Sequence, residues 1–195
     1  MNYEEIKEKI NFAKKRYDDL CLLNDGDLPG ANPSERQMLA QEFFVHLVGS
    51  IDYLFQRINE VEDLGLDKDD VTIFKILRKL DNKKPLYKEL SSLYCNPKKE
   101  PNLINDGGYS FCNSEKGLIY RLWNYRHQVV HRGRQAFYIT MPVGSTTSVK
   151  RGANLVLDPR SKPPVGSNRT VQTDLMEMLN LVNSKFEKIH KLINS

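Results

Sequence analysis

Apolar residues along the chain recur at steps of three and four, the spacing that places side chains on one face of an α-helix. The first apolar stripe ends at the turn-forming sequence NDG, residues 24–26. A second stripe follows NPSE, residues 32–35, where Asn32 can cap a helix and Pro33 suits its first position. This stripe is wide and extends to Val61, which predicts a helix at the centre of a bundle. The two stripes consist of Ile6, Ile10, Ala13, Tyr17 and Leu20, and of Leu39, Phe43, Leu47, Ile51, Leu54, Ile58 and Val61, widened by Phe44, Val48 and Phe55.

Shorter apolar patterns follow. Residues 71–80 and 86–94 fit two short helices separated at Pro85. The segment 96–108 is rich in turn-forming residues and predicts a loop.

Two long helices are expected in the second half of the chain. One extends from about Asn113 to Arg132, with Gly133 as its stop. The other is the last helix of the chain. Its apolar residues again step by three and four and comprise Val171, Leu175, Met178, Val182, Phe186, Ile189 and Ile193.

Between these helices the pattern changes to that of strands. The segments AFYITMPV and NLVLDP, within an insertion at about 137–165, can pair as a hairpin across residues 144–153. We therefore expect an all-α fold, an up-and-down four-to-six-helix bundle with a small β-hairpin or loop insertion before the last helix. Its 195 residues and 39% hydrophobic composition suit one core, so residues 1–195 are expected to form a single domain.

Composition narrows the class of protein. No run reaches the roughly 18 apolar residues of a membrane span, and the start MNYEEIKEKI lacks the layout of a signal peptide. We therefore expect a cytoplasmic protein that does not engage a membrane. Cys21, Cys95 and Cys112 are too widely spaced to indicate a disulfide framework or a cysteine metal site.

The charge is unevenly distributed. The first 100 residues hold 16 basic against 19 acidic residues, a balance of −3, whereas the remainder holds 13 against 6, a balance of +7. No acid occurs between Lys116 and Leu157. This basic half favours an anionic partner such as a phosphodiester chain, although a solvated basic face has the same composition.

The segment YRLWNYRHQVVHRGRQ, residues 120–135, contains four arginines and two histidines, which are candidates for binding or cleaving a phosphodiester. A histidine with a pKa near ~6.5 exchanges protons near neutral pH, and an arginine offers a permanent charge and a fork of donors for phosphate. Together they suffice to cleave RNA without a metal, through attack of the ribose 2′-hydroxyl on phosphorus. Arg126 and His131 lie about 140° apart around a helix, whereas His127 and His131 share a face. Two copies of the helix meeting across a twofold axis would form one shared cleft, which predicts a homodimer.

The sequence RHQVVH, residues 126–131, resembles the R-x(4-6)-H signature of the HEPN superfamily, in which a polar residue commonly follows the arginine. Its place late in a penultimate long helix is also similar, and the bundle resemblance covers residues 34–193. The resemblance implies a metal-independent endoribonuclease that needs no cofactor and acts on RNA in toxin-antitoxin, phage-defence or RNA-processing settings, where a cognate antitoxin or regulatory protein is a possible partner. Arg126 would stabilise the phosphate, His131 would act as acid and base, and His127 would be the accessory polar residue.

The chain departs from some family branches at Gly133, where those branches have a tyrosine that a partner nucleotidyltransferase modifies. The resemblance also includes members that are non-catalytic RNA-binding, nucleotide-binding or interaction modules, which is the alternative function. We expect further backbone-binding charges at Arg121, Arg132 and Arg134, and possible cleft support from Glu42, His46 and Asp52, which could orient Arg126.

Several of these residues also fit ordinary structural roles that involve no catalysis or binding. Arg126 and His131 fit a surface arginine and a histidine that complements the helix dipole. The spacing of His127 and His131 suits a metal, but HQVVH lacks the glutamate of the zinc-protease motif and no third ligand is evident, so no metal site is expected. Trp123 and Tyr125 suit base stacking, but their spacing favours core or dimer packing.

Overall fold

The computed structural model describes residues 2–24, 33–94, 114–127, 137–139, 153–155 and 170–194. This part of the chain is predominantly helical, as expected for an all-α protein. In chain order its elements are α1 (Tyr3–Asn24), α2 (Pro33–Val61), the 3₁₀ helix η1 (Lys68–Asp70), α3 (Ile73–Lys79), α4 (Pro85–Leu93), α6 (Glu115–Tyr125), β1 (Phe137–Ile139), β2 (Ala153–Leu155) and α7 (Val171–Ile193).

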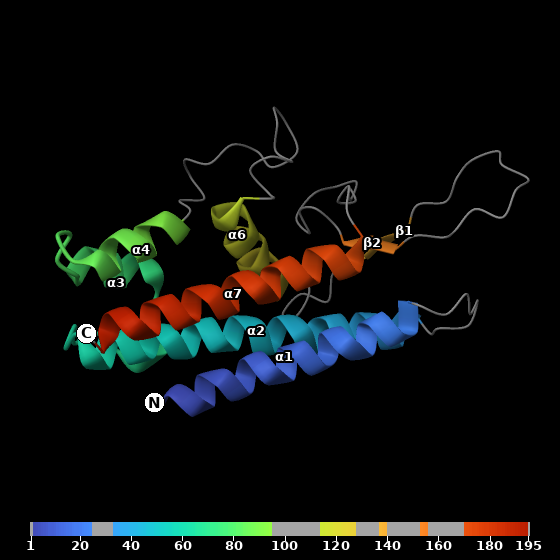
Figure 1. Ribbon diagram of the computed structural model, residues 1–195, viewed down its shortest axis with the longest axis horizontal. Coiled ribbons are helices and arrows are strands. Elements are labelled where there is room, and N and C mark those ends of the chain that lie inside the picture. The colour runs from blue at the N-terminus through green and yellow to red at the C-terminus, as the bar shows by residue number, and fades with distance from the viewer. Residues whose placement is uncertain are drawn as a thin grey trace, which may run out of the picture.

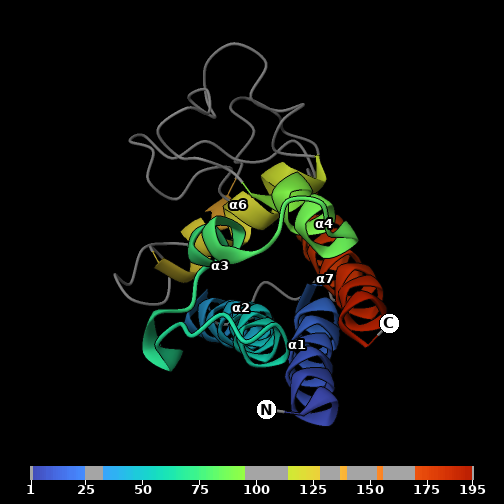
Figure 2. The ribbon, with the colours of Figure 1, turned by 90° about the vertical axis from the view of Figure 1, so that its left-hand side faces the viewer.

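Three long helices, α1, α2 and α7, lie alongside one another (Figure 1). Helices α2 and α7 run in one direction and α1 runs in the other, so the two ends of the chain lie at the same end of the molecule (Figure 1). The short helices α3, α4 and α6 lie together on one side of these long helices (Figure 2). The strands β1 and β2 pair antiparallel, with Tyr138 opposite Asn154. The rest of the predicted insertion lies outside the described residues.

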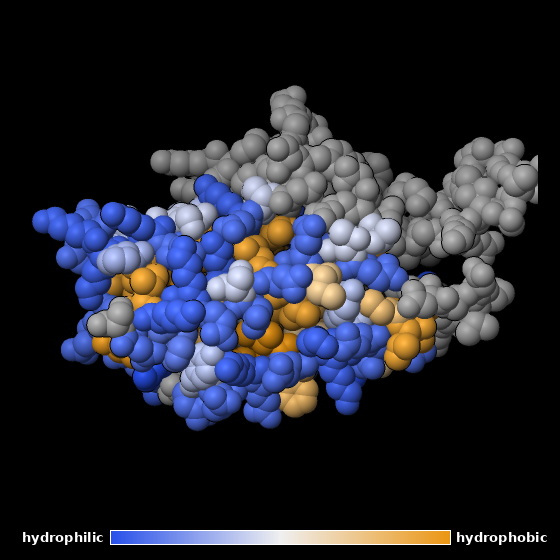
Figure 3. All heavy atoms as spheres, viewed as in Figure 1, coloured by the Kyte–Doolittle hydropathy of each residue, from blue (hydrophilic) through white to orange (hydrophobic). Residues whose placement is uncertain are grey.

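Helix α2 supplies the centre of the core, as its wide apolar stripe predicted. Phe43, Phe44, Leu47, Val48 and Ile58 are completely buried. The stripes expected on the first and last helices are buried as well, except that Tyr17 is only half-buried. Val61 is the exception on α2, because it is the last residue of the helix and is 38% exposed. Hydrophilic residues cover most of the face seen in Figure 3, with hydrophobic residues visible between them.

Local sequence sets where several helices begin. The side chains of Thr72, Ser114 and Thr170 accept backbone hydrogen bonds at the starts of α3, α6 and α7, which satisfies amide groups that have no partner within the helix. The two short helices predicted on either side of a break at Pro85 are confirmed as α3 and α4, except that Pro85 is itself the first residue of α4. A proline has no N–H to lose at that position and its fixed φ suits it.

The third predicted long helix differs in its limits. It begins at Glu115 because Ser114 caps it, and Arg126 and His127 continue it as a π-helical turn. Residues 128–132 lie outside the described part of the chain. Among the helices that the structure describes, none combines the length and apolarity needed to cross a membrane.

Candidate functional site

Helix α6 carries two arginines with opposite environments. Arg121 is completely buried, and its Nη1 and Nη2 donate to Oδ1 and Oδ2 of Asp174 on α7 at 3.2 and 3.0 Å. Its Nη2 also donates to the hydroxyl of Tyr125 at 3.2 Å. Burial opposes the charge, but Tyr125 and Asp174 outweigh it and raise the pKa of Arg121 above its ordinary value.

The expectation that Arg121 binds nucleic acid is therefore wrong. A phosphate cannot reach a guanidinium that is 0% exposed and already engaged by a carboxylate. The absence of acids near Arg121 in the sequence was misleading, because its partner Asp174 is 53 positions further along the chain. The distribution of charged residues along the sequence could not identify this pair, because it compares only residues that are neighbours in sequence.

Arg126 leaves the same helix on another side. Five residues correspond to about 140° around a helix, and this rotation turns Arg126 away from α7 towards α2. There its Nη1 donates to Oδ2 of Asp52 at 2.8 Å, and the two side chains are 34% and 27% exposed. Arg126 is thus held in place while about a third of its side chain remains open to solvent.

Asp52 lies in the second half of α2 in a partly desolvated position. Burial raises the pKa of its carboxyl above the ordinary value, and the neighbouring Arg126 charge reduces that increase. Both the geometry and the electrostatics therefore couple Asp52 to Arg126. Among the three residues predicted to support a cleft, Asp52 is the one that the structure brings to Arg126.

The other two predicted supporting residues, Glu42 and His46, contact α1 instead. Glu42 pairs with Arg16, and the ring of His46 stacks on Phe12 with centroids 5.2 Å apart. Six residues separate His46 from Asp52, which is about 120° around α2. Glu42 and His46 therefore belong to the face that α1 covers, and orienting Arg126 falls to Asp52.

His46 is unusual among these residues because its Nδ1 is buried without a hydrogen-bond partner. Burial lowers its pKa, and the positive charges of Lys9 and Arg16 add to this effect, while Glu42 opposes it. The imidazole is consequently held towards its neutral form.

His127 follows Arg126 in the π-helical turn and is exposed. His131, Arg132 and Arg134 lie outside the described residues, so the predicted pairing of Arg126 with His131 lies outside them too.

The two aromatic residues that precede Arg126 pack against rings of α2. Tyr125 is buried and stacks on Phe44, with ring centres 4.6 Å apart, and the ring centre of Trp123 lies 6.4 Å from that of Phe55. The expectation for both was packing in the core or at a dimer interface rather than base stacking.

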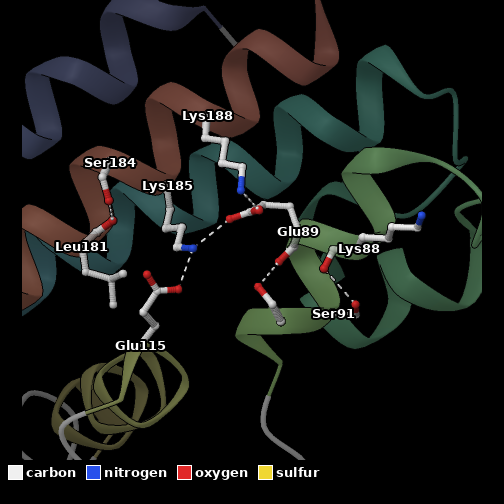
Figure 4. A network of polar contacts seen from close by, with 9 residues as sticks. Lys88, Glu89, Ser91, Glu115, Leu181, Ser184, Lys185 and Lys188 are labelled. Atoms are coloured by element: carbon white, nitrogen blue, oxygen red, sulfur yellow. Dashed lines mark hydrogen bonds and ion pairs between the residues drawn. The ribbon is translucent and has the colours of Figure 1, made fainter.

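A network of charges that the sequence did not reveal fixes α6 relative to α4 and α7 (Figure 4). Lys185 on α7 bridges Glu89 on α4 and Glu115 on α6, with N–O distances of 2.9 and 2.6 Å. Lys188 pairs with the other oxygen of Glu89. Burial raises the pKa of Glu89, but the two lysines more than offset this and lower it. The network secures the start of the helix whose end carries Arg126.

No group of three or more His, Cys, Asp or Glu side chains in the described part of the chain is arranged to hold a metal ion. Cys21, the cysteine that falls within the described ranges, is a free thiol.

Comparison of the chain with protein-family models, with curated proteins and with solved structures gives no significant match.

Proposed function

We propose that the chain is a metal-independent endoribonuclease in which Arg126 binds the scissile phosphate and His131 transfers protons. The observation that supports this most is the ion pair between Arg126 and Asp52, which holds a partly exposed guanidinium at the end of α6. The acid-free sequence that follows supplies further cations at Arg132 and Arg134. The proposal includes the HEPN-like up-and-down bundle with a hairpin insertion, a single domain and a cytoplasmic location.

The chemistry needs no group beyond these side chains and the RNA. The 2′-hydroxyl of one ribose gives its proton to a base and forms a bond to the adjacent phosphorus, while the bond to the 5′-oxygen breaks and that oxygen takes a proton from an acid. His131 serves in these transfers, with His127 as the accessory polar group. Arg126 stabilises the extra negative charge of the phosphorane. The products end in a 2′,3′-cyclic phosphate and a 5′-hydroxyl.

Asp52 serves as a positioning residue in this proposal. A flexible arginine loses side-chain entropy when it is fixed, and an ion pair formed before RNA binds removes part of that cost. Because Arg carries five N–H donors, the 2.8 Å contact of Nη1 with Asp52 leaves other donors available for a phosphate oxygen.

The proposal also includes a homodimer, because Arg126 and His131 are on different sides of an ideal helix and a second copy would supply the missing group to each cleft. Light scattering at micromolar concentration should give twice the chain mass. A monomer that still cleaves RNA would contradict the shared cleft and leave the residue assignment to be tested separately.

The deciding experiment incubates the protein with labelled RNA in EDTA and analyses the product ends. Cleavage to 2′,3′-cyclic ends should be lost in Arg126→Ala and in His131→Ala. The matched control is Arg16→Ala, which removes another partly exposed arginine that is paired with acids. If RNA stays intact but binds in a salt-sensitive manner, the chain is a non-catalytic RNA-binding module. If His131→Ala keeps full activity, the role of His131 is wrong.

A further inference from the structure

The segment from Thr72 to Tyr94, which forms α3, α4 and their connecting turn, is strongly basic. It holds six basic residues against two acidic ones, a balance of +4 that equals the net charge of the whole chain. The acid-rich sequence around it hides this excess, because the first 100 residues together are net negative. The basic residues are Lys75, Arg78, Lys79, Lys83, Lys84 and Lys88.

Only two of these cations are paired with carboxylates in the described part of the chain. Lys75 pairs with Asp70, and Lys84 pairs with Glu62. Lys79 donates to the backbone oxygen of Leu64 at 2.7 Å, which fixes its side chain but does not neutralise its charge.

The acids of the segment do not neutralise the remaining cations. Glu89 is engaged by Lys185 and Lys188 of α7, and Asp81, the other acid of the segment, accepts a hydrogen bond from the backbone N–H of Lys83 at 2.9 Å. The side-chain charges of Arg78, Lys83 and Lys88 therefore form no ion pair with a carboxylate among the described residues. An anion is the natural complement of such a surface.

An exposed aromatic ring lies beside one of these charges, Arg78. Phe74 is 47% exposed, its ring centre lies 6.0 Å from that of Tyr94, and the guanidinium carbon of Arg78 lies 5.6 Å from its centre. A large apolar ring that is half open to water beside an arginine and a second ring offers a stacking surface and a charge together. Proteins that bind single-stranded nucleic acid use this combination, since every base has a face that can stack.

We infer that Phe74, Tyr94 and Arg78, together with Lys83 and Lys88, bind single-stranded nucleic acid. A base stacks on the exposed part of Phe74, and the neighbouring phosphates approach Arg78 and the two lysines. A hydrophobic protein partner would cover the ring but leave these three charges without counterions, whereas a polynucleotide satisfies both.

This surface is separate from Arg126. The helices α3 and α4, which carry this surface, lie on the same side of the long helices as α6 (Figures 1 and 2). The inference concerns binding alone and does not require the chain to cleave RNA, so its test is independent of the proposed nuclease activity.

The test measures binding by fluorescence anisotropy with a labelled single-stranded 2′-O-methyl RNA, which cannot undergo attack by a 2′-hydroxyl. Phe74→Ala should weaken binding at least about fivefold, the loss expected for one stacked base. Phe74→Tyr keeps the ring and should bind as the unchanged chain does. Arg78→Ala should weaken binding and reduce the dependence on salt by about one counterion.

Matched controls come from α1. Phe12→Ala removes another exposed aromatic ring, 43% exposed, and Lys15→Ala removes another exposed cation. Both should leave affinity unchanged, and thermal melting of each variant checks that it is folded. A single-stranded DNA oligonucleotide that depends equally on Phe74 supports the inference, because stacking does not need the ribose 2′-oxygen.

Three outcomes would overturn the inference. The first is that neither oligonucleotide binds. The second is that Phe74→Ala and Arg78→Ala bind as tightly as the two controls. The third is that unlabelled duplex RNA competes as well as the single strand, since a duplex hides the base faces and such competition would indicate a purely electrostatic surface.

Discussion

Arg121 on α6 and Asp174 on α7 face each other inside the core through two N–H···O hydrogen bonds, with side chains that are 1% and 0% exposed. Five residues later on the same helix, Arg126 meets Asp52 of α2 at the surface. Arg121 therefore links α6 to α7 within the core, whereas Arg126 keeps part of its side chain exposed to solvent. Removing either one should consequently affect a different property of the protein.

Replacing Arg121 should damage the fold. Arg121→Ala removes the guanidinium that pairs with the buried carboxylate of Asp174, and loss of one partner of a buried ion pair costs about 3–5 kcal/mol of unfolding free energy. Urea denaturation followed by circular dichroism measures this loss. The double variant Arg121→Met, Asp174→Leu should recover much of it, because neither charge then remains in the core. The matched control is Arg126→Ala, whose partly exposed pair should contribute no more than about 1 kcal/mol. A stable Arg121→Ala chain that has lost RNA binding would contradict the buried structural role.

Replacing Asp52 should damage function more than stability. Asp52→Asn keeps the shape of the side chain but removes the charge that holds Arg126, and misplacement of a catalytic group by about 1 Å costs up to about 100-fold in rate. Cleavage should fall while the unfolding free energy changes by no more than about 1 kcal/mol. Asp52→Glu, which keeps the charge, should restore part of the activity. Unchanged cleavage in Asp52→Asn would remove Asp52 from the proposed site.

Glu89 should contribute to stability in a pH-dependent way. Its pKa in the folded protein lies below the ordinary value of 4.5 because Lys185 and Lys188 outweigh the effect of burial. The stabilisation is therefore present above pH 4.5 and is lost as the pH falls through the lowered pKa. Glu89→Gln should unfold more easily at pH 7, by about 1–3 kcal/mol, and should lose less stability than the unchanged chain between pH 5 and 3. Denaturation curves across this range provide the measurement, with the exposed Glu8→Gln as control.

His46 should titrate below the usual pH of a histidine. Burial, Lys9 and Arg16 lower its pKa from the ordinary 6.5, so the unfolded chain binds a proton at His46 more readily than the folded one. Stability should fall as the pH decreases below about 6.5, and His46→Gln should reduce that fall. An NMR titration of the His46 ring protons measures the pKa directly. A midpoint at or above 6.5 would show that the stack on Phe12 leaves the ring well solvated.

Much of the fold was predictable from local patterns. The stripe from Leu39 to Ile58 identified the buried face of α2, and the serine before Glu115 and the threonine before Val171 cap the helices that follow them. The differences concern helix limits, such as the start of α4 at Pro85 itself, because helix limits depend on capping bonds at single residues.

The candidate site was predictable only in part. Arg126 was identified from its neighbours in sequence, and Asp52 was one of three possible supports, but nothing local distinguished it from Glu42 and His46. The basic surface around Phe74 was missed entirely, because Asp70, Glu62 and other nearby acids made the first half of the chain look acidic.

The sequence by itself determined which segments are helical and which face of each long helix is buried, because helix periodicity and capping act over only a few residues. The tertiary structure alone decided which charges are compensated. Arg121 finds Asp174 53 positions away, Arg126 finds Asp52 74 positions away and Lys185 finds Glu89 96 positions away. Each of these pairs depends on how two helices are rotated towards each other, and that rotation is set by the packing of the whole core.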